Sequence, residues 1–191
     1  METIRAFVAV PLNTKTIKLI SGLQETLKKN EADIKWVQPE NMHLTLIFLG
    51  EVLEEQLTDY YRILENCSLK IPRFNLNFQG LGAFPALKRP RVLWVGVKKG
   101  KDEMAQLAYM VRTSLGQASL LNEKELNQKY SAHLTLGRVR SQERLPELIG
   151  NIYGNQSFCT EPVKVNQFHF IKSQLTRSGP IYSVLRKFYL K

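Results

Sequence analysis

The chain contains few of the residues that cross-link a small protein or hold a metal. Its 191 residues include only two cysteines, Cys67 and Cys159, which lie far apart and form no C-x-x-C pair. We therefore expect neither a disulfide framework nor a cysteine metal site. Only three histidines are present and no H-E-x-x-H segment occurs, so we expect no metal site of three or four protein ligands.

Long apolar segments are also missing. The longest hydrophobic runs have the length of a β-strand, which is too short to cross a bilayer. The amino-terminal segment lacks the basic-then-apolar pattern of a secretory signal. We therefore expect a cytoplasmic protein in a reducing compartment that has no membrane partner. A chain of this size can bury a sizeable core without cross-links.

Acidic residues are few in comparison with basic ones. There are 17 Asp and Glu against 27 Lys and Arg, which gives a formal net charge of +10. Such a charge favours a polyanionic partner, because a basic face speeds encounter with phosphate chains and adds salt-dependent affinity. A cationic surface that serves only solubility is the alternative. An anionic membrane is a weaker candidate, since no segment sets Lys and Arg opposite an apolar face.

Against this background one tetrapeptide occurs twice. His-Leu-Thr-Leu begins at His43 and again at His133, and the two copies use two of the three histidines. In a strand, alternate side chains share a face, so each histidine and the threonine two residues later would point one way while the leucines point the other. Each copy would then present one titratable ring and one hydroxyl from a strand whose other face is buried. The simpler alternative is that HLTL is only a good β tetrapeptide.

The order of predicted elements shows the same duplication. Strand, helix, strand and helix followed by further strands occur once from residue 5 and again from residue 91. We therefore predict an α+β fold in which two antiparallel sheets face a central cleft, with helices on the outer faces. Some strands could cross between the lobes, so we treat residues 1–191 as a single bilobal domain with pseudo-twofold related lobes. The predicted strands cover 5–10, 34–37, 42–49, 74–79, 91–97, 133–139, 163–171 and 181–190; helices start near residues 14, 53, 102 and 145, and a turn lies around 178–180.

Two histidines of this kind suit phosphate chemistry. An attacking and a leaving oxygen lie roughly in line on opposite sides of phosphorus, so a base is needed on one side and an acid on the other. Histidine can fill both roles near neutral pH. A threonine hydroxyl beside each ring can donate to the non-bridging oxygens as their charge grows. The sequence therefore favours metal-independent acid/base catalysis, with noncatalytic capture of phosphorylated RNA ends as the alternative.

These motifs and their flanking segments resemble the RNA 2′,3′-cyclic phosphodiesterases, also described as 2′-5′ RNA ligases, of the two-histidine phosphoesterase superfamily. The resemblance covers nearly the whole chain, through the segments RAF, WV, HLTL, FLG, GAFP, RVLWVGV, HLTLGR and GPIY. It implies hydrolysis of RNA 2′,3′-cyclic phosphate ends to 2′-phosphomonoesters without metal or cofactor. It also implies His43 as proton donor, His133 as proton acceptor, and Thr45 and Thr135 as phosphate ligands. Ligation in the reverse direction would use the same site, and no obligate protein partner is inferred.

Two positions near the second motif need comment. The family often has Pro immediately before that motif, and this chain has Ala132, which removes a backbone restraint but no reactive group. Arg138 is a candidate phosphate ligand, although strict alternation from His133 places it on the opposite face of the strand. A bulge at Gly137 would be needed to turn Arg138 toward the site, and a surface ion pair is the alternative.

Other residues are candidates for holding RNA. The segment 84–91 combines an aromatic ring with cations between two prolines, a composition suited to a single-stranded backbone. A solvated basic loop explains the same residues. Trp36 and Tyr182 could stack on the terminal nucleoside, with aromatic packing in the core as the alternative. His169 has no threonine two residues later, and we expect it to be structural or exposed. The candidates for RNA contact are Phe84, Lys88, Arg89, Arg91, Trp36 and Tyr182.

Overall fold

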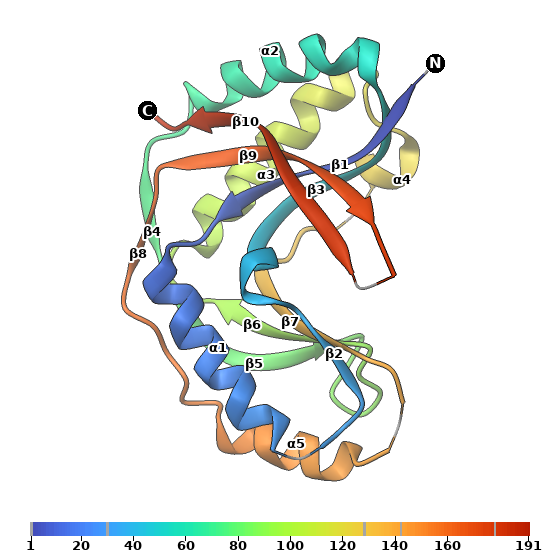
Figure 1. The fold of residues 1–191 in the computed structure, drawn as a ribbon. Coiled ribbons are helices and arrows are strands. Elements are labelled where there is room, and N and C mark those ends of the chain that lie inside the picture. The colour runs from blue at the N-terminus through green and yellow to red at the C-terminus, as the bar shows by residue number, and fades with distance from the viewer. Residues whose placement is uncertain (1, 30, 128, 142, 178) are drawn as a thin grey trace.

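A computed structural model describes residues 2–29, 31–127, 129–141, 143–177 and 179–191. The fold is α+β, as predicted, with two four-stranded antiparallel sheets (Figure 1). The upper sheet has the order β10-β9-β1-β3 and the lower sheet has the order β2-β7-β6-β5. The strands are β1 (Thr3–Pro11), β2 (Ile34–Trp36), β3 (His43–Leu53), β4 (Phe74–Leu76), β5 (Phe78–Phe84), β6 (Val92–Val97), β7 (His133–Val139), β8 (Val163–Val165), β9 (Gln167–Leu175) and β10 (Pro180–Tyr189).

Helices cover each sheet on its apolar side. The helices α2 and α3 lie against the upper sheet, with the short α4 beside β3, and α1 and α5 lie against the lower sheet (Figure 1). None of the helices in the described ranges is long and apolar enough to cross a bilayer. The helices are α1 (Thr14–Lys28), α2 (Leu57–Ser68), α3 (Lys101–Gln117), α4 (Glu123–Leu126) and α5 (Leu145–Gly154), and two 3₁₀ turns, η1 (Pro39–Asn41) and η2 (Glu54–Gln56), flank β3.

Local chemistry sets several of these boundaries. The Asn13 side chain caps α1 by accepting a hydrogen bond of 2.8 Å from the Thr16 amide. Gly100, at φ 79°, begins α3 in a left-handed conformation that other residues rarely adopt. The core side of α3 carries Met104, Leu107 and other buried apolar residues at helical spacing. These helices therefore form where the sequence pattern places them.

Both sheets contain strands from both halves of the chain. β1 and β3 pair in the upper sheet, but β1 also pairs with β9 from the second half. β6 and β7 pair in the lower sheet, but β6 also pairs with β5 from the first half. The short strands β4 and β8 pair with each other as the chain crosses. Since the helix after β1 covers the lower sheet, each half depends on the other to complete its core.

Several predicted boundaries are wrong. The strand expected to stop at Gly50 continues to Leu53, because Gly50 takes φ 66° beside a register shift and so forms a bulge instead of an end. The predicted strands 74–79 and 163–171 are each divided into two elements. Their first parts are β4 and β8, which pair with each other, and the next parts, β5 and β9, each join a four-stranded sheet. The polar stretch after α3 contains α4. The turn predicted at 178–180 includes residue 178, which lies outside the described residues.

Candidate active site

The two HLTL tetrapeptides begin β3 and β7. Leu44 and Leu46 are buried in the first copy, and Leu134 and Leu136 are buried in the second. All four histidine and threonine side chains of the motifs are half-buried. The strands therefore anchor the leucines in the core and present the rings and hydroxyls on their opposite faces.

Each motif histidine is held by a backbone carbonyl two residues earlier. The His43 Nδ1 atom lies 2.7 Å from the Asn41 carbonyl oxygen, and the His133 Nδ1 atom lies 2.7 Å from the Ser131 carbonyl oxygen. Because a carbonyl only accepts hydrogen bonds, Nδ1 must carry a proton and donate it. Each neutral ring then has an unprotonated Nε2, and each charged ring has an Nε2 that can donate. The two rings are thus prepared in the same way for proton transfer.

Burial makes both rings difficult to protonate. Desolvation lowers the pKa of His43 from 6.5 to about 4, against a smaller raising effect of its hydrogen bond to Asn41. The pKa of His133 is also lowered, first by desolvation and to a smaller extent by the positive charge of Arg138. Both rings are therefore neutral at neutral pH in the ligand-free protein.

Aromatic side chains enclose the two rings. Phe7 lies 4.8 Å from the His43 ring centroid, and Tyr182 meets the same ring edge-on at 5.4 Å. Phe84 meets the His133 ring edge-on at 4.9 Å, and Trp94 lies 6.5 Å from it. These rings exclude water from one side of each imidazole, which is the source of the lowered pKa values.

The two motifs lie at one site. Strands β3 and β7 are in contact although they belong to different sheets. Thr45 from the first motif and His133 from the second line the same pocket. Burial raises the pKa of Tyr182, whose ring contacts His43, and the positive charge of Arg138 on β7 offsets part of this rise. The fold therefore brings together motif residues that are 90 positions apart in the chain.

A bulge in β7 turns Arg138 toward this site. Thr135 pairs with Trp94 and Gly137 pairs with Leu93, so β7 has one extra residue, Leu136, between the two pairs. After the bulge, Arg138 shares a face with His133 and Thr135, and it acts electrostatically on both His133 and Tyr182. The position that strict alternation gave to Arg138 is therefore wrong, and the bulge that turns it lies at Leu136, one residue before the position considered.

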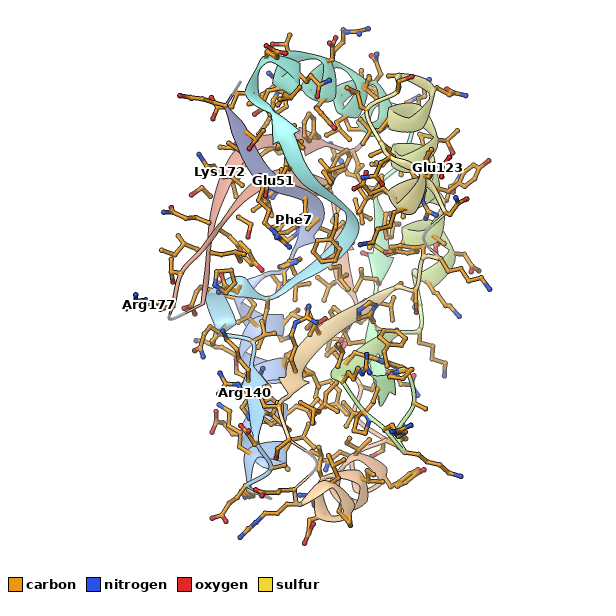
Figure 2. The ribbon with its side chains drawn as sticks, turned by 90° about the vertical axis from the view of Figure 1, so that its right-hand side faces the viewer. Phe7, Glu51, Glu123, Arg140, Lys172 and Arg177 are labelled. Carbon is orange, nitrogen blue, oxygen red and sulfur yellow. The ribbon has the colours of Figure 1, made fainter. Side chains whose placement is uncertain are left out.

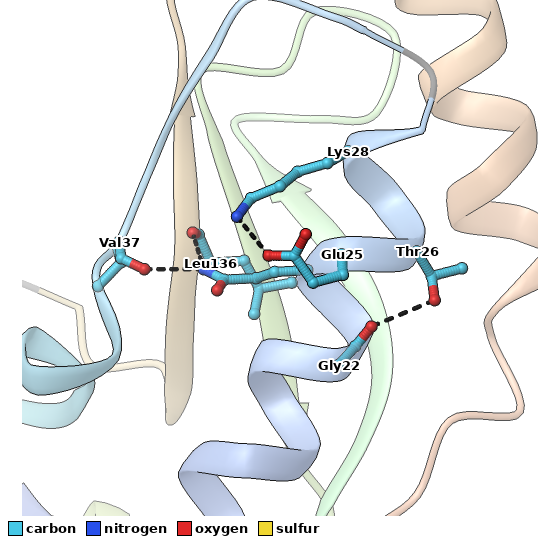
Figure 3. Close-up of polar contacts among 7 residues, drawn as sticks. Gly22, Glu25, Thr26, Lys28, Val37 and Leu136 are labelled. Atoms are coloured by element: carbon cyan, nitrogen blue, oxygen red, sulfur yellow. Dashed lines mark hydrogen bonds and ion pairs between the residues drawn. The ribbon is translucent and has the colours of Figure 1, made fainter.

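A buried glutamine on α1 holds this bulge. Gln24 is 2 % exposed, and its Nε2 donates to the carbonyl oxygens of Leu136 at 2.8 Å and Val37 at 2.9 Å. Figure 3 labels these two acceptor residues. The Val37 amide also donates to the Leu136 carbonyl, at 2.9 Å. Gln24 thus adds a second donor to the Leu136 carbonyl at the bulge and donates to the Val37 carbonyl just after β2.

The predicted RNA-binding residues have different positions. Phe84 and Tyr182 lie beside the motif histidines. Trp36 is half-buried and packs against the core next to Gly137, where an added Cβ would lie 3.2 Å from the indole. The remaining candidates are exposed in the loop between β5 and β6, close in sequence to Phe84; they are Lys88, Arg89 and Arg91.

The third histidine is buried, which agrees with the structural one of the two alternatives expected for it. His169 is 7 % exposed and pairs across the sheet with Ala9 on one side and Lys187 on the other. Its Nε2 has no hydrogen-bond partner in the part of the chain that the structure describes. Burial and the nearby Lys187 charge lower the pKa of His169 to about 4.

Sequence reasoning missed three residues of the site. Gln24 has no recognisable signal, because a polar residue on an amphipathic helix is usually exposed. Phe7 and Phe48 belong to strands that were predicted. Which residues they contact depends on the bulges of β3, and Gly50 is the single sign of a bulge in the local sequence. Figure 2 shows Phe7 inside the upper lobe, whereas Lys172, Arg177 and Arg140 lie toward one side of the view and Glu123 toward the other.

The fold and the paired motifs place the chain in the class of two-histidine phosphoesterases. The family model described as LigT like Phosphoesterase matches residues 10–94 and again residues 95–182, so that each match contains one motif. The protein belongs to the LigT-like phosphoesterase family.

Curated relatives and solved structures agree with this assignment. A relative from Aquifex aeolicus named RNA 2′,3′-cyclic phosphodiesterase is 37 % identical, covering 100 % of this chain and 99 % of the relative. A relative of the same name from Archaeoglobus fulgidus is 37 % identical over 96 % of this chain and 99 % of its own. The crystal structure of TT0787 of Thermus thermophilus has a TM-score of 0.81 at 27 % identity, with 98 % of each chain covered. E. coli LigT complexed with 3′-AMP has the same fold, with a TM-score of 0.77 at 24 % identity and 100 % and 99 % coverage.

Proposed function

We propose that the protein hydrolyses the 2′,3′-cyclic phosphate at an RNA end to a 2′-phosphomonoester, without metal or cofactor. The observation that carries this proposal is the pair of H-x-T-x strands from two sheets, in contact and with matching Nδ1 hydrogen bonds. The names of the relatives and the net charge of +10 support RNA as the substrate. The low cysteine content supports a reducing, cytoplasmic setting, and no obligate protein partner is inferred.

The reaction divides the proton transfers between the two rings. His133 Nε2 takes a proton from water as its oxygen attacks phosphorus, and the bond between phosphorus and the 3′ oxygen breaks. His43 Nε2 gives its proton to the departing 3′ oxygen, and the product retains the 2′ ester. The hydroxyls of Thr45 and Thr135 donate to the non-bridging oxygens, and Arg138 balances their charge.

His43 needs its substrate in order to act as the acid. With a pKa of about 4 in the free protein, this ring is largely neutral at neutral pH. A bound anionic phosphate beside Nε2 favours the charged imidazole and raises its pKa. The assignment of His43 as donor and His133 as acceptor follows the family resemblance, because the two hydrogen-bond arrangements are equivalent.

Hydrolysis of a cyclic-ended oligoribonucleotide in excess chelator tests the proposal. We expect a 2′-phosphorylated product, and we expect His43→Ala and His133→Ala each to lower kcat by about 10²- to 10⁴-fold. His169→Leu is the matched control, because it removes a histidine outside the site. Full activity of His43→Ala would refute the assigned chemistry. Equal binding of cyclic-ended and 3′-hydroxyl RNA, with no turnover of either, would indicate a noncatalytic module.

A further inference from the structure

A pocket continues from the motif residues toward α3 and α4. Thr45 and His133 line it, and the Phe48 ring on β3 is an apolar part of its wall. Arg112 on α3 and Lys129, just before β7, line the same pocket. The pocket therefore joins the reacting groups to two cations that the proposed chemistry does not use.

The lining of this pocket also includes a carboxylate, Glu125. Both carboxylate oxygens of Glu125 accept hydrogen bonds from Asn122, one from the backbone amide at 3.0 Å and one from the side-chain amide at 2.9 Å. Tyr130 contributes a neutral hydroxyl, because burial raises its pKa more than the nearby Arg112 charge lowers it. The two cations, Arg112 and Lys129, outnumber this carboxylate, so the lining has a net positive charge and a hydroxyl donor, which favour an anion.

A bulge in β3 shapes the apolar wall. Thr45 pairs with Ala9 and Ile47 pairs with Val8, so β3 has an extra residue, Leu46, at the position where β7 has Leu136. Phe48 follows His43 by five residues, as Arg138 follows His133. The equivalent positions therefore carry a cation on β7 and an aromatic ring, 48 % exposed, on β3. This difference gives the otherwise paired site two unlike ends.

The two ends match the two parts of a nucleotide chain. The Arg138 end suits the reacting phosphate, and an exposed ring next to cations suits a nucleoside that is followed by another phosphate. An RNA end has such a second phosphate, because a phosphodiester links its terminal nucleotide to the preceding one. A free nucleoside 2′,3′-cyclic monophosphate has none.

We propose that Arg112, Lys129 and Tyr130 form a subsite for the phosphodiester that joins the terminal nucleotide of the RNA to the one before it. This proposal rests on the proposed function, since it concerns the same substrate. The preferred substrates would then be oligonucleotides in which this phosphodiester is charged, and cyclic mononucleotides would be poorer substrates.

A comparison of three substrates tests the subsite. The substrates are a ribodinucleotide ending in a 2′,3′-cyclic phosphate, the same dinucleotide with a neutral methylphosphonate linkage, and the nucleoside 2′,3′-cyclic monophosphate. We expect the wild type to prefer the charged dinucleotide about tenfold in kcat/KM, because one charge-assisted hydrogen bond accounts for about that factor. This preference should weaken with added salt.

Charge-removing variants locate the effect. Arg112→Gln and Lys129→Gln should each reduce the ratio of kcat/KM values for the charged and neutral dinucleotides toward one. Lys129 is exposed, so its variant provides the test even if Arg112→Gln does not fold. Arg62→Gln, on the exposed side of α2, is the matched control and should retain the wild-type ratio. An unchanged ratio in a folded Lys129→Gln and, if it folds, Arg112→Gln would overturn the proposal.

Binding of the reaction products separates this proposal from the proposed function. Titration with the 2′-phosphorylated dinucleotide and with the nucleoside 2′-monophosphate requires no turnover. A wild type that hydrolyses neither substrate but binds the dinucleotide about tenfold more tightly would contradict the proposed function and support the subsite. Equal affinity for the two products would overturn the subsite.

Discussion

At the scale of single residues, the two motif imidazoles have the same hydrogen-bond arrangement and the same direction of pKa shift. In both rings Nδ1 donates to a carbonyl two residues earlier in the chain, which fixes the tautomer and leaves Nε2 for chemistry. In both rings burial lowers the pKa. The carbonyl hydrogen bonds therefore fix the tautomer, whereas burial makes the charged form costly until an anion binds.

This gives a prediction for the pH dependence of kcat/KM. One ring must be charged and the other neutral, so the profile is bell-shaped, and its limbs report the two pKa values of the free enzyme. Because both values lie below the ordinary 6.5, with His43 at about 4, the optimum should lie on the acid side of pH 6.5. The profile for kcat should lie at higher pH, since bound phosphate raises the pKa of the acid.

Steady-state rates on the cyclic-ended dinucleotide between about pH 4 and pH 9 provide the measurement. Circular dichroism at each pH is the control for acid unfolding. A flat profile for kcat/KM across this range, or an optimum above neutrality, would contradict paired catalysis by the two buried rings.

At the scale of elements, the extra residue at Leu136 decides what β7 presents. Without it, Arg138 would share a face with the buried leucines. Gln24 crosses from α1 to hold the carbonyl at the bulge, so a helix remote from the motif in sequence orients a side chain of the site. Gln24 is thus a positioning residue in our interpretation.

Replacement of Gln24 by methionine, which has a similar volume, tests this role. The replacement removes the Gln24 donor from the Val37 carbonyl and leaves the Leu136 carbonyl with the Val37 amide alone, so we expect a loss of about 1–3 kcal/mol in the free energy of unfolding. We also expect a lower kcat/KM for the cyclic end. Urea denaturation and steady-state rates measure the two effects, with Gln106→Met on the exposed face of α3 as the control.

A double-mutant cycle with Arg138→Ala shows whether Gln24 acts through Arg138. The activity losses of the two single variants should then be less than additive in the double variant. Strict additivity would mean that Gln24 supports stability alone and has no part in placing Arg138.

At the scale of the whole molecule, the halves of the chain complete each other. β5 from the first half extends the sheet of β6 and β7, and β9 from the second half extends the sheet of β1 and β3. We therefore infer that the chain folds as one bilobal unit and not as two separable domains.

Division of the chain in the loop between β5 and β6, after Ala86, tests this inference. In each fragment, the sheets would lack the strands that the other fragment supplies, and their apolar faces would be uncovered. We therefore expect neither fragment alone to show a cooperative thermal transition. An equimolar mixture should regain the transition and part of the activity. A fragment that unfolds cooperatively by itself would contradict the inference.

The sequence by itself determined the strands that carry both motifs, the helices with clear apolar stripes and the α+β class. These features depend on local periodicity and capping, which involve residues close together in the sequence and can therefore be predicted from it. It also predicted the two histidines and two threonines as candidates, because their spacing in a strand puts each pair on one face.

Only the tertiary structure decided which strands exchange between sheets, where β3 and β7 bulge, and that Arg138 faces the site while Trp36 packs on the core. It also decided that Gln24 is buried, that His169 is enclosed, and that Phe48 and Arg112 line one pocket. These outcomes depend on contacts between residues far apart in the chain, and a one-residue bulge reverses the side-chain face that a period of two assigns.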